Sequence, residues 1–452
     1  MKDWIRKATA ILRTRLSQSS SVTSSEDRSI LNFLLRGMSW TALFRVVNLI
    51  SGFTISVVLA RLLGAEDYGI FQYVNSWIAL LGVFAGLGLE KIVIREIAAA
   101  YSNSNWSEIK GIRRFALFVG TISGVVFAII GVLLWFSFEK GKNVNVFLIA
   151  ALRLPLERLV QFLSAVQNGF EQIPAAGFPN MVRDAGFALV LFLVWAVGIP
   201  LDAPTQAIGI RVMTVLAAVG FAMYLQISLS KNQGDFFLEA EPTYHPKDWM
   251  VAALPLVFLA GTLTLNSNAD ILMLGQLVSP EVVGPYHAAT RGSMLVTFAL
   301  TALINPLSPV IARLHSNGEH EQLQRMLSKL TRRIFFATLL LALALILGSK
   351  WFLSLFGSDF IVAQTALIIL IGGRVISVGV GPVQRLLVMS GQERIATAGA
   401  MLSTIVNLSL NGLLIPRWGI EGAATATALS IVTWNLLMLW QVKKRLNLSM
   451  WG

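Results

Sequence analysis

Cysteine is absent from the 452 residues of the chain, and histidine occurs only four times. The lack of cysteine excludes disulfide bonds, thiol chemistry and thiolate metal sites. The sequence also lacks a phosphate-binding glycine loop ending in Gly-Lys-Ser/Thr and a Gly-x-Ser-x-Gly motif. The histidines show none of the spacings of metal ligands: they are His245, His287, His315 and His320. We therefore predict no metal, no cofactor and no enzyme chemistry.

Charged residues are also scarce, at 13% of the chain, whereas hydrophobic residues make up 55% and the mean hydropathy is +0.68. Such a composition is too apolar for a soluble protein and indicates an integral membrane protein. The 36 basic residues exceed the 24 acidic ones, for a formal net charge of +12. In a membrane protein this excess is expected in the cytoplasmic loops, so it does not indicate a nucleic-acid partner.

Twelve apolar runs are long enough to cross a bilayer core of about 30 Å, which takes about 20 residues in a helix. They begin near residues 38, 70, 115, 144, 177, 205, 250, 284, 334, 361, 394 and 421. With the N-terminus inside, 23 loop and tail arginines and lysines lie inside and five lie outside. This bias places both termini in the cytoplasm. The predicted fold class is all-α integral membrane, with about twelve transmembrane helices.

The sequence repeats itself across its two halves. NGFEQIPAAG, which starts at Asn168, is matched by SGQERIATAG, which starts at Ser390, 222 residues later. GAEDYGIF, from Gly64, is matched by SPEVVGPY, from Ser279, 215 residues later. Six spans separate the matching segments, so the two halves enter the membrane in the same direction. Two parallel six-helix lobes of this kind are typical of alternating-access transporters, with the binding site between the lobes.

These features divide the chain into four parts. We predict a basic amphipathic and Ser-rich tail at 1–30, an N-lobe at 31–232, a cytoplasmic linker at 233–247 and a C-lobe at 248–452. The tail shows no cleavable signal peptide. Its apolar face predicts an interfacial helix on anionic lipid, with a disordered basic tail as the alternative.

Four segments carry a resemblance to a known family: LARLLGAEDYGIFQYVNSW, ILMLGQLVSPEVVGPYHAATRGS, LINPLSPVIARL and NGLLIPRWGIEGAATATALS. They resemble polysaccharide transporters of the multidrug/oligosaccharidyl-lipid/polysaccharide (MOP) exporter superfamily, and most of all the Wzx-type flippases. The resemblance covers residues 31–442 and implies transport of undecaprenyl-diphosphate-linked oligosaccharides across the bacterial plasma membrane. These motifs mark loops and helix ends, so they identify no binding residue.

Eight arginines lie inside the predicted spans with only four acidic residues. At about 2.5 kcal/mol or more for each mid-membrane arginine, eight facing lipid cost on the order of 20 kcal/mol, more than the usual stability of a protein. We expect structural roles for Arg183, Arg385 and Arg211, which lie near a membrane surface. The other five are candidate substrate ligands in a water-filled cationic cavity: Arg45, Arg153, Arg158, Arg291 and Arg374.

Span four, ALRLPLERLVQFL at residues 151–163, carries two of these arginines. Arg153 and Glu157 lie four residues apart on one helix face and neutralise each other, which leaves Arg158 as a surplus charge. Guanidinium groups grip phosphate oxygens in a forked geometry. We therefore predict that span four binds an anionic headgroup, with Glu157 orienting Arg153. For each arginine alone, a salt bridge between helices is the alternative.

Span seven contains TLTLNSNAD, in which Thr262, Asn266 and Asp270 follow each other at intervals of four along one helix face. This stripe is a candidate site for a coupling ion, H⁺ or Na⁺. The alternative is a polar seam that hydrogen-bonds to a neighbouring helix. The run VGVGP, at residues 378–382, predicts a bend in span ten.

Together these observations predict a flippase rather than an enzyme. Its expected substrate is an undecaprenyl-diphosphate-linked oligosaccharide for O-antigen, exopolysaccharide or capsule synthesis, and polysaccharide polymerase machinery is an expected partner. A multidrug antiporter of the same superfamily is one alternative, but its cationic drugs would require acidic or apolar walls. A membrane glycan polymerase or ligase is the other, but it would need a sizeable outer loop, and all the predicted outer loops are short.

Overall fold

The computed structural model describes residues 25–201, 203–232 and 240–451. Within these ranges, the side chains of residues 25–43, 45–46, 229–232 and 298–309 are outside the description. The amphipathic pattern of the N-terminal tail lies before residue 25, so it also falls outside. The described residues form helices and contain no strand, which confirms the all-α fold class.

The described elements follow one another along the chain as helices. They are α2 (Ser25–Gly86), α3 (Leu89–Ser102), α4 (Trp106–Glu139), α5 (Val144–Ala151), α6 (Arg153–Gly169), α7 (Ile173–Val197), α8 (Pro204–Asn232), α10 (Pro246–Leu277), η1 (Pro280–Val282), α11 (Val283–Ser316), α12 (His320–Leu347), α13 (Ser349–Ser354), η2 (Ser358–Ala363), α14 (Gln364–Val380), α15 (Val383–Met389) and α16 (Glu393–Leu446).

Eight described helices are long and apolar enough to cross a membrane, but two of them contain a turn. The 54 residues of α16 would extend about 80 Å as one straight helix, more than twice the thickness of a bilayer core. Its backbone leaves the helical region at Gly419, where φ is 53°. A Cβ on Gly422 would lie 2.3 Å from the carbonyl oxygen of Leu414, eight residues earlier, because the chain has turned back. Gly64, with φ 76°, interrupts α2 in the same way.

Two further predicted spans account for the remaining crossings. Span four is divided into α5 and α6, because Pro155 has no N–H with which to bond the carbonyl of Ala151. Span eight corresponds to α11, of which several side chains are outside the description. Counting α2 and α16 twice and adding these two gives the twelve crossings expected from the sequence.

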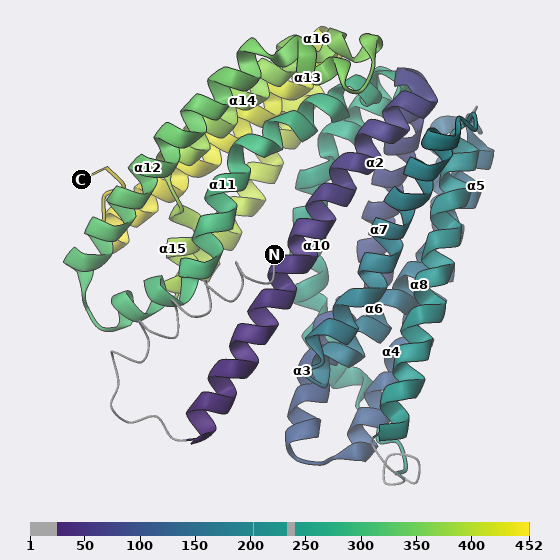
Figure 1. Cartoon of the computed structure of the whole chain (residues 1–452), viewed down its shortest axis with the longest axis vertical. Coiled ribbons are helices and arrows are strands. Elements are labelled where there is room, and N and C mark those ends of the chain that lie inside the picture. The colour runs from purple at the N-terminus through teal and green to yellow at the C-terminus, as the bar shows by residue number, and fades with distance from the viewer. Residues whose placement is uncertain (1–24, 202, 233–239, 452) are drawn as a thin grey trace.

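Figure 1 shows two bundles that converge at one end of the molecule and diverge at the other. We call α2–α8 the N-lobe and α10–α16 the C-lobe. At the convergent end a shared apolar core draws side chains from both lobes, such as Phe147 and Phe187 from one and Phe352 and Phe356 from the other. At the divergent end each lobe has its own apolar core.

Helix α10 lies between the two lobes (Figure 1) and contacts both of them. Its first half packs on the N-lobe, where Trp249 and Ala253 belong to the apolar core of α3 and α4. The close approach requires Gly88, since a Cβ there would lie 2.5 Å from the carbonyl oxygen of Ala253. Its second half joins the C-lobe through Asp270. One helix therefore contacts both lobes.

The lobes are joined at the convergent end by polar contacts. The hydroxyl of Tyr68 on α2 hydrogen-bonds to Nδ1 of His287 on α11 at 2.9 Å, and both side chains are buried. Arg61 donates to the carbonyl oxygens of Leu355 at 2.8 Å and Ser354 at 3.1 Å. These contacts close the interior of the molecule at this end, which we call the sealed end.

A short segment after α16, residues 447–451, folds back over the C-lobe. Met450 is buried in the apolar core of that lobe. The indole Nε1 of Trp451 donates to the carbonyl oxygen of Gly379 at 2.7 Å, beside the predicted bend in span ten. The helix does break there, at Gly381, where φ is 83°. The segment thus supplies a donor to a carbonyl at the end of α14.

Candidate functional site

The N-lobe contains a charged cavity of about 630 Å³ on the side that faces α10. Residues of α2, α3, α6, α7, α8 and α10 line it. The charged residues of the lining are Glu90, Lys91, Arg153, Glu157, Arg158, Arg183 and Arg211. Asp184 forms ion pairs with the last two and is counted with them. Five basic residues are accompanied by three acidic ones, so the N-lobe cavity has an excess of two positive charges.

Arg153 lies at the first residue of α6, directly after the break at Leu152. Its Nη2 is 2.9 Å from Oε1 of Glu157, as the spacing of four predicts, and its Nη1 is 2.5 Å from Oδ1 of Asn75. Two partners therefore fix the guanidinium in place. Arg153 and Glu157 both line the cavity, so the predicted pairing of the two side chains is confirmed.

Arg158 is not the uncompensated charge that the sequence of span four suggests. Its Nη1 lies 2.8 Å from Oε1 of Glu90 on α3, so the expected surplus is balanced by a neighbouring helix. Glycines at positions 82 and 86 of α2 make room for the guanidinium, since a Cβ on Gly86 would lie 2.6 Å from Nη1. The Nε of Arg158 is buried without a hydrogen-bond partner. This side chain thus retains unused donors.

Arg183 and Arg211 line the same cavity, although the sequence places them near the membrane surfaces in structural roles. Both bind Asp184: Nη2 of Arg183 is 2.8 Å from one carboxylate oxygen, and Nη2 of Arg211 is 2.6 Å from the other. Asp184, the next residue in the sequence, thus balances the charge of Arg183. Their position in the cavity has no signal in the sequence, because it depends on how α7 and α8 pack against α6.

Helix α10 presents polar side chains to both lobes. Thr264, Ser267 and Asn268 line the N-lobe cavity, whereas Asn266 lines a pocket in the C-lobe. The predicted stripe of Thr262, Asn266 and Asp270 is not brought together at one point. Thr262 donates to the carbonyl of its own helix at Phe258, and none of the hydrogen bonds that Asp270 makes involves either of the other two residues.

Asp270 is buried in the C-lobe within a network of neutral side chains. One carboxylate oxygen accepts from Nδ2 of Asn411 at 2.9 Å. The other accepts from the hydroxyls of Tyr286 at 2.6 Å and Thr427 at 2.5 Å. Oδ1 of Asn411 is buried beside it without a hydrogen-bond partner. Three neutral donors and a spare acceptor oxygen therefore surround the carboxylate.

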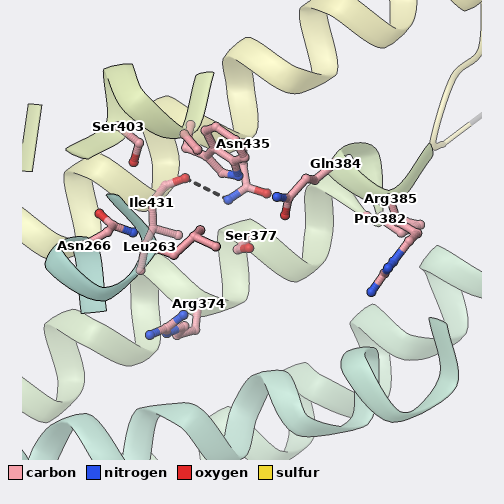
Figure 2. A pocket seen from close by; sticks show the side chains of 13 residues that line it. Leu263, Asn266, Arg374, Ser377, Pro382, Gln384, Arg385, Ser403, Ile431 and Asn435 are labelled. Carbon is pink, nitrogen blue, oxygen red and sulfur yellow. Dashed lines mark hydrogen bonds between the residues drawn. The ribbon is translucent and has the colours of Figure 1, made fainter. Parts of the chain in front are cut away.

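The remaining three candidate arginines lie elsewhere. Arg374 lines a C-lobe pocket of about 400 Å³, which is shown in Figure 2. Arg291 lines a mostly apolar pocket of about 510 Å³ between α2 and α11, beside Leu49 and Phe53. The backbone of Arg45 is part of α2, but its side chain lies outside the described residues. The structure thus brings Arg153 and Arg158 together with Arg183 and Arg211, and places Arg374 and Arg291 in two other pockets.

Two bundles of membrane-spanning helices that enclose a charged interior define a membrane transporter. The chain belongs to the polysaccharide biosynthesis protein family, whose model matches residues 34–315. The MatE family model also matches it, at residues 255–413. Both matches confirm the resemblance to polysaccharide flippases of the MOP superfamily.

Two relatives from Haloferax volcanii are flippases by name. The chain is 24% identical to the probable low-salt glycan biosynthesis flippase Agl15 over 379 residues, which cover 84% of this chain and 77% of the relative. It is 30% identical to the probable flippase AglR over 176 residues, which cover 37% and 36%. These relatives are transport proteins and not enzymes, in agreement with the prediction from the sequence.

Solved structures show the same fold. A multidrug resistance MATE transporter of the MOP superfamily in an inward-facing conformation aligns with a TM-score of 0.71 at 12% identity, covering 88% of this chain and 94% of the transporter. The lipid II flippase MurJ in an inward closed conformation aligns with a TM-score of 0.58 at 16% identity, covering 89% and 87%. The chain is therefore a multi-pass membrane protein with the MOP superfamily fold.

Proposed function

We propose that the protein flips a lipid-diphosphate-linked oligosaccharide between membrane leaflets by alternating access, with the diphosphate bound in the N-lobe cavity. The observation that carries this proposal is the excess of two positive charges in that cavity. In a lipid diphosphate sugar each of the two phosphate groups carries one negative charge, so the ligand and the cavity match in charge. A cationic drug would be repelled by the same excess.

The ion pairs prepare the arginines for this role. Bringing a bare guanidinium into the membrane interior is expensive, and a carboxylate partner reduces that cost while it fixes the orientation of the side chain. A guanidinium has five N–H groups, and the contacts to Glu157 and Asn75 occupy three of those of Arg153. Arg158 uses one. The remaining donors are available to phosphate oxygens that enter the cavity.

We further propose a setting for this activity. The charge bias of the loops supports cytoplasmic termini and entry of the substrate from the cytoplasm. The Wzx-like motifs support a bacterial plasma membrane, an undecaprenyl carrier and a role in O-antigen, exopolysaccharide or capsule synthesis, with polymerase machinery acting next. Two flippase relatives come from Haloferax volcanii. The chemical nature of the polyprenyl carrier is therefore the first property to determine.

Deletion of the gene in its source organism tests this function. We expect one polyprenyl-diphosphate glycan to accumulate on the cytoplasmic leaflet, and mass spectrometry of the membrane lipids identifies both carrier and sugar. Wild-type protein should remove the accumulated lipid, whereas Arg153→Ala should not, at an equal membrane level. If no lipid-linked glycan accumulates, the proposed substrate class is wrong.

We also propose that Asp270 binds the coupling cation. Its ionised carboxylate and the unpartnered Oδ1 of Asn411 together offer oxygen ligands, which Na⁺ prefers, in a site that holds no second acidic side chain among the described residues. Asn266 and Thr262 do not belong to this site. Transport by Asp270→Asn in vesicles should lose its dependence on a Na⁺ or H⁺ gradient, and an unchanged dependence would return Asp270 to a structural role.

A further inference from the structure

The C-lobe pocket in Figure 2 differs in chemistry from the N-lobe cavity. Its described lining contains two arginines, Arg374 and Arg385, and no acidic residue. Amides and hydroxyls supply most of its other polar groups. They come from α10, α14, α15 and α16 and are Asn266, Ser377, Gln384, Ser403 and Asn435.

Several of these groups have no partner within the protein. The side chains of Asn266, Ser377 and Gln384 take part in none of the hydrogen bonds among the described residues. The Nε of Arg374 is buried and also has no hydrogen-bond partner. Asn266 and Gln384 are exposed in the open pocket, so their amides are available to a ligand, whereas the buried Nε of Arg374 costs about 1–3 kcal/mol as long as it has no partner. This pocket is therefore prepared for a ligand rich in hydrogen-bonding groups.

The pocket also has an apolar wall formed by Leu263, Ile431 and Trp434. The indole of Trp434 packs against Gly399, where a Cβ would lie 2.8 Å from the ring. A saccharide ring combines hydroxyl groups at its edge with C–H groups on its faces. Amides beside an aromatic ring match both features.

The break in span ten creates the polar side of the pocket. Arg374 and Ser377 lie before Gly381, and Gln384 lies after Pro382. In an unbroken helix, successive side chains point about 100° apart around the axis, and the gap in the helix at residues 381–382 would be absent. Trp451 bonds the carbonyl of Gly379 on this same stretch, so it holds the broken segment in position.

We propose that this C-lobe pocket is the saccharide subsite of the transported lipid, which rests on the function proposed above. Its volume of about 400 Å³ lies within the range of small-molecule sites, about 300–1,000 Å³. Leu263 of α10 lines both this pocket and the N-lobe cavity. The two sites thus lie on either side of one helix, whose diameter with side chains is about 10–12 Å. One substrate molecule places its diphosphate in the N-lobe and its sugar in the C-lobe.

The test compares two ligands on the full-length protein in lipid nanodiscs. One is the lipid-linked glycan that accumulates in the deletion strain, and the other is the same polyprenyl diphosphate without sugar. Gln384→Ala and Asn266→Ala remove polar groups that have no partner within the protein, so both variants should fold normally. We expect each to weaken binding of the glycan lipid about tenfold and to leave binding of the bare diphosphate unchanged. Gln322→Ala, an exposed glutamine outside the pocket, is the matched control.

The outcomes separate this inference from the proposed function. If Arg153→Ala weakens the binding of both ligands and the two C-lobe variants weaken only the binding of the glycan lipid, the saccharide subsite is supported. If the C-lobe variants weaken both ligands equally, the pocket holds phosphate and the inference is wrong. If they weaken neither, the pocket does not bind substrate. If wild-type protein binds neither ligand, the proposed function itself fails.

Discussion

Gly69 and Gly284 lie against each other at the sealed end, and they occupy the same position in the two copies of the internal repeat. A Cβ on Gly69 would lie 2.9 Å from the backbone nitrogen of Gly284, and a Cβ on Gly284 would lie 3.2 Å from that of Gly69. The absence of both side chains lets α2 and α11 approach at backbone distance. This pair of repeated glycines therefore contributes to the close contact between the two lobes.

Alternating access requires this sealed end to open in each cycle. Because the chain has no cysteine, Arg61→Cys and Ser354→Cys introduce the only two thiols, one in each lobe. A short bifunctional thiol reagent that joins them should abolish transport, and a cleavable reagent should restore transport on reduction. Each single variant treated in the same way is the control. Full transport by the cross-linked protein would contradict closure and opening at this end.

The pair of Arg153 and Glu157 allows a comparison of buried and exposed charges. Both side chains of this pair are mostly buried, so Glu157→Gln leaves a guanidinium without its counter-charge and should lower the free energy of unfolding by about 3 kcal/mol. Glu321 pairs with Arg325 at the same spacing of four but is 93% exposed. Glu321→Gln should therefore change stability by less than about 0.5 kcal/mol. Thermal unfolding in detergent measures both variants, and equal effects would contradict the stronger dependence of the buried pair on its counter-charge.

Trp451 gives a prediction about the broken span ten. Trp451→Ala removes the bond to Gly379 and the contact between the indole and Phe335, whose ring centroids lie 5.2 Å apart. We expect a loss of about 2 kcal/mol in stability, since the side chain is only partly buried. Trp351→Ala removes an indole that is 79% exposed and should have little effect. An equal loss of thermal stability in the two variants would show that the 447–451 segment does not hold the break.

Local patterns in the sequence were sufficient for the spans, the repeat and the pairing of Arg153 with Glu157. Each depends on composition or on a spacing of a few residues, which the helix itself converts into geometry. The partner of Arg158 lies 68 residues away on α3, and no local pattern connects the two. The same reason explains why Arg183 and Arg211 were expected at the surface.

The distribution of the candidate arginines over separate pockets could not be predicted from the sequence for another reason. Depth in the membrane can be counted along a helix, but the direction of a side chain depends on how the lobes pack. Arg374 and Arg153 were both expected in one cationic cavity, yet they line separate pockets. The polar face of α10 at Thr264 and Ser267 was not predicted either. These two residues lie on both sides of Asn266 in the sequence, which is the signal of a helix with polar side chains on two faces.

The central claim is that the N-lobe arginines bind the diphosphate during transport. Its most direct test is the rate at which purified protein in vesicles moves the accumulated lipid-linked glycan across the bilayer, for wild type, Arg158→Ala and Arg158→Lys. A charge-assisted hydrogen bond contributes about 1.5–3 kcal/mol, so Arg158→Ala should slow transport roughly 10- to 100-fold. Lysine lacks the planar fork and should restore only part of the rate. Wild-type rates in both variants, at equal amounts of folded protein, would contradict the account.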